Sequence, residues 1–298
     1  LEKIAVKSSD LSRTHRERLV KSGFLKEVMR GWYIPTRPDE PAGERTSWYT
    51  SFWDFCTAYL HSRFGQDWSL SPEQSIILHA GNRTVPRQLL VRAPLARNQT
   101  TSLPFDTSIF ETRARMAEEG ELEIDANGLH LFSIESALLY CPEPFFRNNP
   151  VDARAALGTF QDGTALLRRL LDGGHSVVAG RLAGAFRNIG RDAIADDLLA
   201  GMRSVGYLVN EQDPFSSPSA LLISSKQVLP HVNRLQLMWM SMRETVLEVF
   251  PAAPGLPANS LAYLQRVTEL FVNDAYNSLS IEGYRVSADL IKQIKAGI

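Results

Sequence analysis

Apolar residues recur every three or four positions over most of the second half of the chain, which is the spacing of an amphipathic α-helix. Three helical segments come first, at 151–171, 175–188 and 192–207. Two longer helices are predicted at 228–250 and 258–282. The apolar stripe of the last one consists of Leu264, Val267, Phe271, Ala275 and Leu279. The sequence therefore predicts an all-helical region over residues 150–298.

The middle of the chain, residues 44–145, mixes helical and strand-like patterns. A helix is predicted at 47–64, where aromatic residues follow helical spacing at Trp48, Phe52, Phe55 and Tyr59. Short apolar runs predict strands at 75–78, 88–91 and 107–110. Asn127-Gly128 predicts the turn of a hairpin over 122–131, because both residues tolerate positive φ. We expect a mixed α/β domain here, with four of the five tryptophans, all within 32–68, in its core.

The first 37 residues predict a helix followed by a hairpin. Ser12 can cap the helix, Gly23 can end it, and Arg30-Gly31 separates two apolar segments in the way a tight turn does. Prolines then predict a linker at 35–43. Two further stretches rich in Pro, Ser and Gly follow at 210–218 and 251–257, and the last is typical of a helix-to-helix turn. Together these patterns predict an α+β protein with domains at 1–37, 44–145 and 150–298.

Charge is unevenly distributed along the 298 residues, although the formal net charge is only −1. Residues 1–37 contain nine Lys and Arg against four Asp and Glu, so this segment is basic and the rest is acidic. Such a segment is typical of a nucleic-acid-binding module. Two cysteines are too few for a disulfide framework or a Cys-rich zinc site. Because we find neither a long apolar run nor a signal-peptide pattern, we expect a cytoplasmic protein without membrane contact.

The segments at 11–16 (Leu-Ser-Arg-Thr-His-Arg) and 21–34 (Lys-Ser-Gly-Phe-Leu-Lys-Glu-Val-Met-Arg-Gly-Trp-Tyr-Ile) resemble the winged helix-turn-helix domain of AbiEi-like antitoxins. The resemblance implies DNA binding, with the helix in the major groove and the wing on the backbone. The candidate contacts are Arg13, Thr14, His15, Arg16, Lys21 and Arg30. Few residues precede Leu11, so we expect the first helix of the motif to be short or missing. The alternative is that this domain binds a protein, and that its Lys and Arg side chains only keep one face of the helix soluble in water.

Ser278, Glu282 and Gly283 form the most informative group near the end of the chain. Ser278 and Glu282 are four residues apart and lie on one face of a helix, which Gly283 can end. A carboxylate at a helix C-terminus is disfavoured by roughly 0.3–1 kcal/mol. Its position is therefore explained best by a cationic partner, such as an arginine from elsewhere.

This group resembles the inhibitory motif of Fic-domain proteins, Ser/Thr-x-x-x-Glu-Gly/Asn, with Ile281 before the glutamate as the family usually has. In that family the glutamate pairs with an arginine of the active-site loop. The pairing prevents productive placement of the ATP γ-phosphate and so blocks AMP transfer to protein hydroxyls. The resemblance implies an inhibitory role for Ser278, Glu282 and Gly283, and a nucleotide-binding catalytic core as partner in cis or in trans.

The Fic catalytic motif, His-Pro-Phe-x-x-Gly-Asn-Gly-Arg, occurs nowhere in this sequence. The segment His79-Ala80-Gly81-Asn82-Arg83 is similar, but its histidine and arginine are four residues apart instead of eight. We therefore expect this chain to be the regulatory portion of a longer Fic protein, inactive by itself and without catalytic residues, metal site or cofactor of its own. ATP and Mg²⁺ are implied only for the core, and a homodimer is compatible with the sequence.

Two other interpretations stay open. One is a DNA-binding regulator or antitoxin of a toxin-antitoxin pair, with the helical half as a partner-binding platform. The other is a helical scaffold in which Glu282 pairs locally with Arg285. The remaining patterns predict packing or solvation, not chemistry. They are the acidic run at 118–125, the methionine-rich helix at 238–242, and the small residues Gly180 and Gly184.

Overall fold

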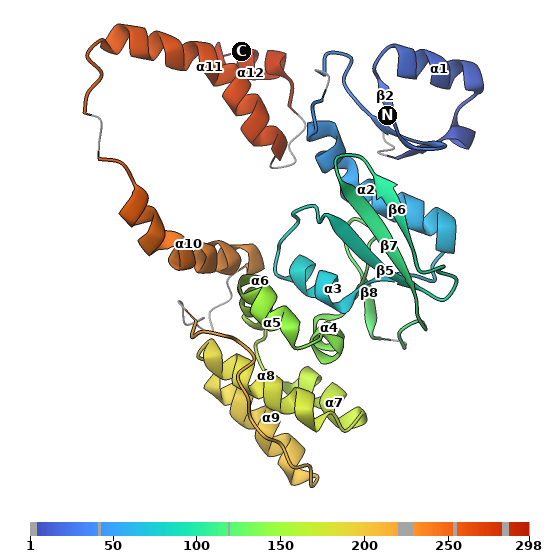
Figure 1. Ribbon diagram of the computed structural model, residues 1–298, viewed down its shortest axis with the longest axis vertical. Helices are drawn as coiled ribbons and strands as arrows, with labels where there is room; N and C mark the ends of the chain where they lie inside the picture. Colours follow the sequence, from blue (N-terminus) through green and yellow to red (C-terminus); the bar gives the residue numbers. More distant parts are fainter. Residues whose placement is uncertain are drawn as a thin grey trace. The chain divides into compact units, whose positions relative to one another are not determined.

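The computed structural model describes residues 5–40, 43–118, 120–219, 229–252, 255–281 and 286–297, and it has helices and three small sheets (Figure 1). The α+β class predicted from the sequence is confirmed. The chain forms two compact units. Unit 1 contains Leu1–Ser62, Leu103–Asp106 and Val249–Ile298, and unit 2 contains Arg63–Ser102 and Thr107–Glu248. The division into domains at 1–37, 44–145 and 150–298 stays a prediction.

The N-terminal part of unit 1 is one helix packed on a three-stranded antiparallel sheet of order β1-β3-β2. Its elements are β1 (Val6–Lys7), a 3-10 turn (Ser8–Asp10), α1 (Arg13–Lys21), β2 (Leu25–Met29) and β3 (Trp32–Pro35). Ser12 Oγ accepts the amide of His15 and caps α1, as predicted. Gly31 adopts a φ of 82° in the β2–β3 turn, which only glycine adopts easily. The predicted helix and hairpin are confirmed.

The helix α2 (Thr46–Phe64) carries the aromatic core of unit 1. Trp48 and Phe55 are almost completely buried, and their ring centroids are 5.4 Å apart in an edge-to-face arrangement. Trp32 of β3 packs edge-to-face on Phe55 and Tyr59, with centroids 5.8 Å away in both cases. Such pairs add about 0.5–1.5 kcal/mol beyond area burial. The helix predicted at 47–64 is confirmed.

Two helices from the end of the chain complete unit 1: α11 (Ser260–Ile281) and α12 (Ala288–Lys295). Ser287 Oγ accepts the amide of Leu290 and caps α12. The side chain of Lys295 returns to α11, where its Nζ donates to the carbonyl of Thr268 at 3.2 Å and lies 4.9 Å from the Phe271 ring centroid. The last turn of α12 thus lies beside the middle of α11, so the two helices form an antiparallel hairpin.

Unit 2 is built on a sheet of order β4-β5-β7-β6 (Figure 1). Its strands are β4 (Ser69–Leu70), β5 (Gln88–Ala93), β6 (Gln99–Leu103) and β7 (Thr107–Arg113), with β5 and β7 parallel. A second pair consists of β8 (Leu122–Ile124) and β9 (His130–Phe132), which confirms the hairpin around Asn127-Gly128. The predicted strands at 88–91 and 107–110 are also confirmed.

The strand predicted at 75–78 is wrong, because this segment belongs to helix α3 (Pro72–His79). A run of three apolar residues, here Ile76, Ile77 and Leu78, fits a buried strand and a buried helix equally well. The residues before the run determine that the segment is helical. Ser71 Oγ accepts the amide of Gln74, and Pro72 occupies the first helical position, where its missing N–H costs nothing.

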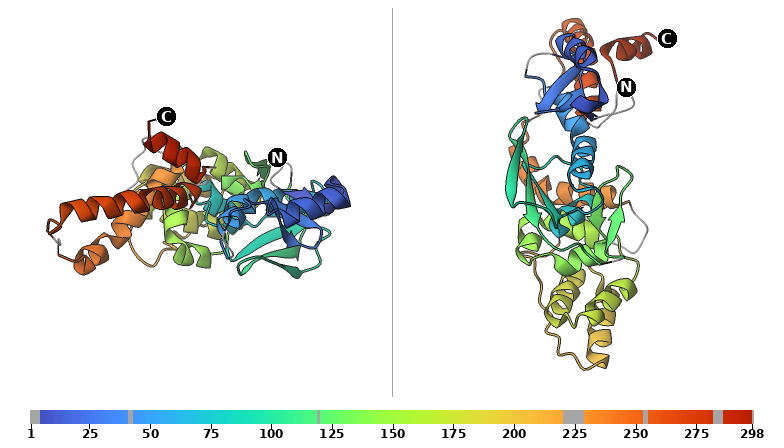
Figure 2. Two further views of the ribbon diagram at one scale, coloured as in Figure 1. Left: turned by 90° about the horizontal axis from the view of Figure 1, so that it is seen from above. Right: turned by 90° about the vertical axis from the view of Figure 1, so that its right-hand side faces the viewer.

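Most of the remaining helices of unit 2 lie at the end away from the sheet, coloured green to yellow in the right-hand view of Figure 2. They are α4 (Ile134–Tyr140), α5 (Pro144–Asn148), α6 (Pro150–Leu157), α7 (Thr164–Asp172), α8 (Ser176–Asn188) and α9 (Asp192–Ser204), followed by α10 (Pro230–Val249). The single helix predicted at 151–171 is two helices, because Gly158 ends α6 and Gly163 precedes α7. The helices predicted at 175–188, 192–207 and 228–250 are confirmed as α8, α9 and α10, whereas α4 and α5 were not predicted.

The helix α10 is anchored by the buried Asn233 and Leu237, whereas Trp239, Met240 and Met242 are about half exposed.

One expectation about exposure is corrected. In the acidic run, Glu121 is only 6% exposed rather than solvated. Its carboxylate accepts the hydroxyl of Tyr140 and the backbone amide of Glu118. Burial and the adjacent carboxylate raise the pKa of Tyr140 to about 12.

Candidate functional site

The outer face of α1 is polar and mostly basic. Thr14, Arg18 and Lys21 are spaced four and three residues apart, so they lie on one side of the helix, and all three are exposed. The opposite side contains Leu19, which packs on the small core formed by Val6, Leu25 and Tyr33. This core holds α1 on the sheet and directs its basic face to solvent.

Arg13 also lies on the outside, but it is already paired. Its Nε donates to Glu17 Oε1 at 2.7 Å, and the two side chains are 83% and 60% exposed. The hydrogen bond and the charge of the partner raise the pKa of Arg13 and lower the pKa of Glu17. Glu17 therefore offsets part of the positive charge at the start of the helix, whereas the last turn carries Arg18 and Lys21.

Arg16, a predicted DNA contact, is turned toward its own unit. Its Nη1 donates to the carbonyl of Ser8 at 3.0 Å, and its guanidinium carbon lies 5.9 Å from the centroid of the Tyr33 ring. Arg16 thus connects α1 to the segment after β1 and to β3. The other predicted contacts, His15 and Arg30, are exposed, His15 in the first turn of α1 and Arg30 at the tip of the hairpin.

Arg18 was not among the predicted contacts, although the spacing of Thr14, Arg18 and Lys21 could have indicated it. What the sequence alone did not reveal is which side of α1 the sheet covers. Over residues 5–37, eight Lys and Arg stand against three Asp and Glu. The basic face of α1 is thus the strongest candidate for an anion-binding surface in this part of unit 1.

The second group of predicted residues lies at the end of α11. This helix runs unbroken from Ser260 to Ile281, and Ser278 is exposed one turn before its end. Glu282 and Gly283 lie outside the described residues. The chain is described again from Val286, directly before Ser287 caps α12. The segment that contains Glu282 therefore connects the two helices of the α11–α12 hairpin.

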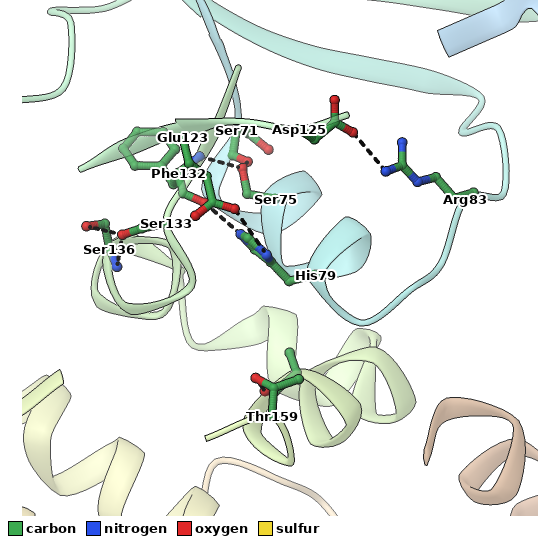
Figure 3. A network of polar contacts seen from close by, with 11 residues as sticks. Ser71, Ser75, His79, Arg83, Glu123, Asp125, Phe132, Ser133, Ser136 and Thr159 are labelled. Atoms are coloured by element: carbon green, nitrogen blue, oxygen red, sulfur yellow. Dashed lines mark hydrogen bonds and ion pairs between the residues drawn. The ribbon is translucent and has the colours of Figure 1, made fainter. Parts of the chain in front are cut away.

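The segment His79–Arg83, which is similar to a catalytic loop in sequence, is part of the scaffold of unit 2 (Figure 3). His79 Nε2 lies 2.8 Å from the carbonyl oxygen of Phe132 and must donate to it, while Nδ1 lies 3.8 Å from Glu123. Arg83 pairs with Asp125 at 2.8 Å. Ser75 Oγ accepts the amide of Phe132 at 3.1 Å. These contacts fasten α3 to the β8–β9 hairpin.

The buried cysteines are also structural in character. Burial raises the pKa of the Cys56 thiol and of the Cys141 thiol well above the ordinary value, so neither is a reactive thiolate at neutral pH. Within the described ranges, we find no group of three or more His, Cys, Asp and Glu side chains that could hold a metal ion. None of the helices in the described part of the chain is long and apolar enough to cross a bilayer.

The comparisons with known proteins assign neither a family nor a function to the chain. No family model, no curated protein and no solved structure matches the chain.

Proposed function

We propose that this chain is the regulatory region of a Fic-type protein adenylyltransferase, whose core transfers AMP from ATP to protein hydroxyls. The observation that carries the proposal is the unbroken course of α11 to Ile281, the residue before Glu282 in the sequence, with Ser278 exposed in the last turn of this helix. In the inhibitory motif the serine and the glutamate are four positions apart, which corresponds to about one turn of a helix, and Ser278 and Glu282 have this spacing in the sequence.

The chemistry of the proposed inhibition follows from the end of the helix. The last carbonyl groups of a helix lack intrahelical partners and carry partial negative charge. A carboxylate beside them is unfavourable until a cation neutralises it, and a guanidinium does this with two parallel hydrogen bonds. In this proposal Glu282 binds an arginine of the catalytic core and withholds it from the nucleotide. ATP and Mg²⁺ belong to the core.

The exposed apolar side chains of α11 support a partner in this position. Leu264, Val267, Phe271 and Leu261 are each at least 45% exposed. The stripe predicted from the sequence is therefore only partly covered by the described residues of this chain. A catalytic core packed along α11, in cis or in trans, would bury these side chains and bring its arginine to Glu282. The test is the transfer of labelled AMP in a protein that contains both this chain and the catalytic motif.

A second function, DNA binding by the N-terminal part of unit 1, is favoured by a different observation. The exposed Thr14, Arg18 and Lys21 share one face of α1, and the antiparallel β2–β3 hairpin follows directly. A helix with a basic outer face followed by a hairpin is the arrangement by which winged domains bind duplex DNA. The two functions are compatible, since a DNA-binding module can be attached to a regulated enzyme.

Replacing Arg18 and Lys21 together by Ala will weaken binding to duplex DNA and make it less dependent on salt. Each lost phosphate contact lowers the slope of log K against log [salt] by about 0.9, so the double variant should lose about 2 from the slope. Fluorescence anisotropy with a labelled mixed-sequence duplex, titrated upward from about 50 mM salt, measures both quantities.

Two variants serve as controls for this experiment. Arg97→Ala removes an exposed positive charge from unit 2 and should leave the slope unchanged. Arg16→Ala should instead lower the stability of the helix-and-hairpin part, because Arg16 holds the Ser8 carbonyl and the Tyr33 ring. Absence of binding by the native chain at about 50 mM salt would remove DNA binding from consideration.

A further inference from the structure

Arg37 joins the N-terminal part of unit 1 to the helix that carries the inhibitory motif. Its guanidinium carbon lies 4.9 Å from the centroid of the Tyr276 ring on α11. Its Nη1 donates to the carbonyl of Val286, at 3.5 Å, and its Nη2 donates to Asp39 at 2.9 Å. Tyr276 precedes Ser278 by two residues, and Val286 follows Gly283 by three. A single side chain therefore contacts the chain on both sides of the motif.

The backbone around Arg37 is in turn fixed to the end of α1. The amide of Thr36 donates to the carbonyl of Phe24 at 3.0 Å, and Thr36 Oγ1 donates to the carbonyl of Gly23 at 2.8 Å. A Cβ on Gly23 would lie 2.9 Å from Pro38 Cα, so the two backbones are in close contact here. Gly23 also has a φ of 73°, which favours glycine. A displacement of the α1–β2 turn would consequently displace Arg37.

We propose that Arg37 is a latch through which the N-terminal helix-and-hairpin part controls the inhibitory motif. While the Arg37 guanidinium lies over the Tyr276 ring and donates to the Val286 carbonyl, it restrains the described chain before and after the motif and favours inhibition. When Arg37 leaves, α11 and α12 lose this restraint and inhibition weakens. The regulatory consequence rests on the Fic-type function proposed above, whereas the latch itself does not.

The chemistry of the three contacts requires arginine. A planar guanidinium can lie on an aromatic ring and still donate hydrogen bonds from its edge, whereas a lysine ammonium is a point charge that cannot do both in one geometry. A contact of this kind at a partly exposed position is weak enough to open and close. The Arg37 side chain is 35% exposed, which fits a contact that opens reversibly.

The first test measures amide hydrogen exchange in the 298-residue chain. Arg37→Ala should speed exchange at residues 276–281 and 286–290 by about two- to fivefold, the factor that a cation–π contact at an exposed site contributes. Arg37→Lys should restore only part of the protection. Arg30→Ala removes an equal charge at the hairpin tip and should leave these residues unchanged. Equal exchange in the native chain and Arg37→Ala overturns the latch.

A double-mutant cycle separates a direct contact from general loosening. If Arg37 acts through Tyr276, then Tyr276→Leu should speed exchange, and adding Arg37→Ala should cause a much smaller further increase than it does alone. Strictly additive effects would contradict a direct contact. Circular dichroism shows whether each variant keeps its helices.

The second test measures AMP transfer in a protein that joins this chain to the catalytic motif. Arg37→Ala should raise labelling two- to fivefold, toward the level of Glu282→Gly. If Glu282→Gly raises labelling and Arg37→Ala does not, the regulatory role of Arg37 is wrong. If Glu282→Gly has no effect, the Fic-type function fails, and the exchange experiment alone decides whether the latch exists.

Discussion

Replacing Glu282 by Gly will raise AMP transfer by about 5- to 150-fold in a protein that contains both this chain and the Fic catalytic motif. This is the range that a regulatory coupling free energy of about 1–3 kcal/mol produces. The substitution removes the carboxylate that would hold the arginine of the core. It also leaves the helix α11 intact up to its last turn, because position 282 follows Ile281. Incorporation of labelled AMP from ATP into the protein itself measures the effect.

A matched substitution on the same helix shows whether the carboxylate is responsible. Glu269 is exposed on α11, and its side chain accepts a hydrogen bond from Gln265 at 3.2 Å. Glu269→Gly removes one negative charge and costs the helix about 1 kcal/mol in propensity. It should leave labelling nearly unchanged. If both variants raise labelling equally, loosening of α11 explains the result, and if neither does, the inhibitory role of Glu282 is refuted.

Replacing Gly180 by Ala will destabilise unit 2 by roughly 2 kcal/mol or more, which corresponds to a Tm lower by about 4–8 °C for a unit of this size. A Cβ at Gly180 would lie 1.9 Å from the carbonyl oxygen of Asn210, and one at Gly184 would lie 2.3 Å from that of Gln212. These two carbonyl groups belong to the backbone, which cannot rotate away from an added methyl group as a flexible side chain can. The contact is reinforced by the amide of Gln212, which donates to the Gly180 carbonyl at 3.1 Å.

Gly201→Ala provides the matched control for this prediction. Gly201 lies in the neighbouring helix α9, and its Cβ would meet Leu167 Cδ2 at 2.4 Å, the far end of a flexible side chain. Rotation of the leucine relieves this contact, and alanine gains about 1 kcal/mol in helix propensity over glycine. Thermal unfolding followed by circular dichroism should therefore show little change for Gly201→Ala. A similar loss in both variants would contradict the prediction that the backbone contact with Asn210 makes Gly180→Ala the more costly substitution.

Periodicity predicted most of the helices but was ambiguous where apolar residues were contiguous. The segment 75–78 was misassigned as a strand, because Ser75, Ile76 and Leu78 are buried without a one-sided pattern and the signal for α3 lies before the run, at Ser71 and Pro72. The strand β6 was missed for the opposite reason. Its sequence, Gln-Thr-Thr-Ser-Leu, is mostly exposed and owes its place to hydrogen bonding at the edge of the sheet.

The sequence predicted which residues group together in each candidate site, but not which way their side chains face. Spacing sufficed to group Ser278 with Glu282, and composition sufficed to find the basic N-terminal segment. Arg16 and Arg18 have the same chemistry two residues apart, yet one is turned inward to Ser8 and Tyr33 while the other faces solvent. Which of the two arginines is exposed to a ligand depends on the side of α1 that the sheet covers. The packing of α1 on the sheet is a contact between different segments of the chain.

The amino-acid sequence by itself determined where the helices and turns form, because capping residues, glycines and apolar spacing act within a few residues of one another. Ser12, Ser71 and Ser287 each cap a helix in this way. Only the tertiary structure decided that Arg37 meets Tyr276 and that Gly180 meets Asn210. Such contacts join segments that are distant in the chain. Their geometry depends on how whole helices and strands pack together, and a local sequence pattern does not encode this packing.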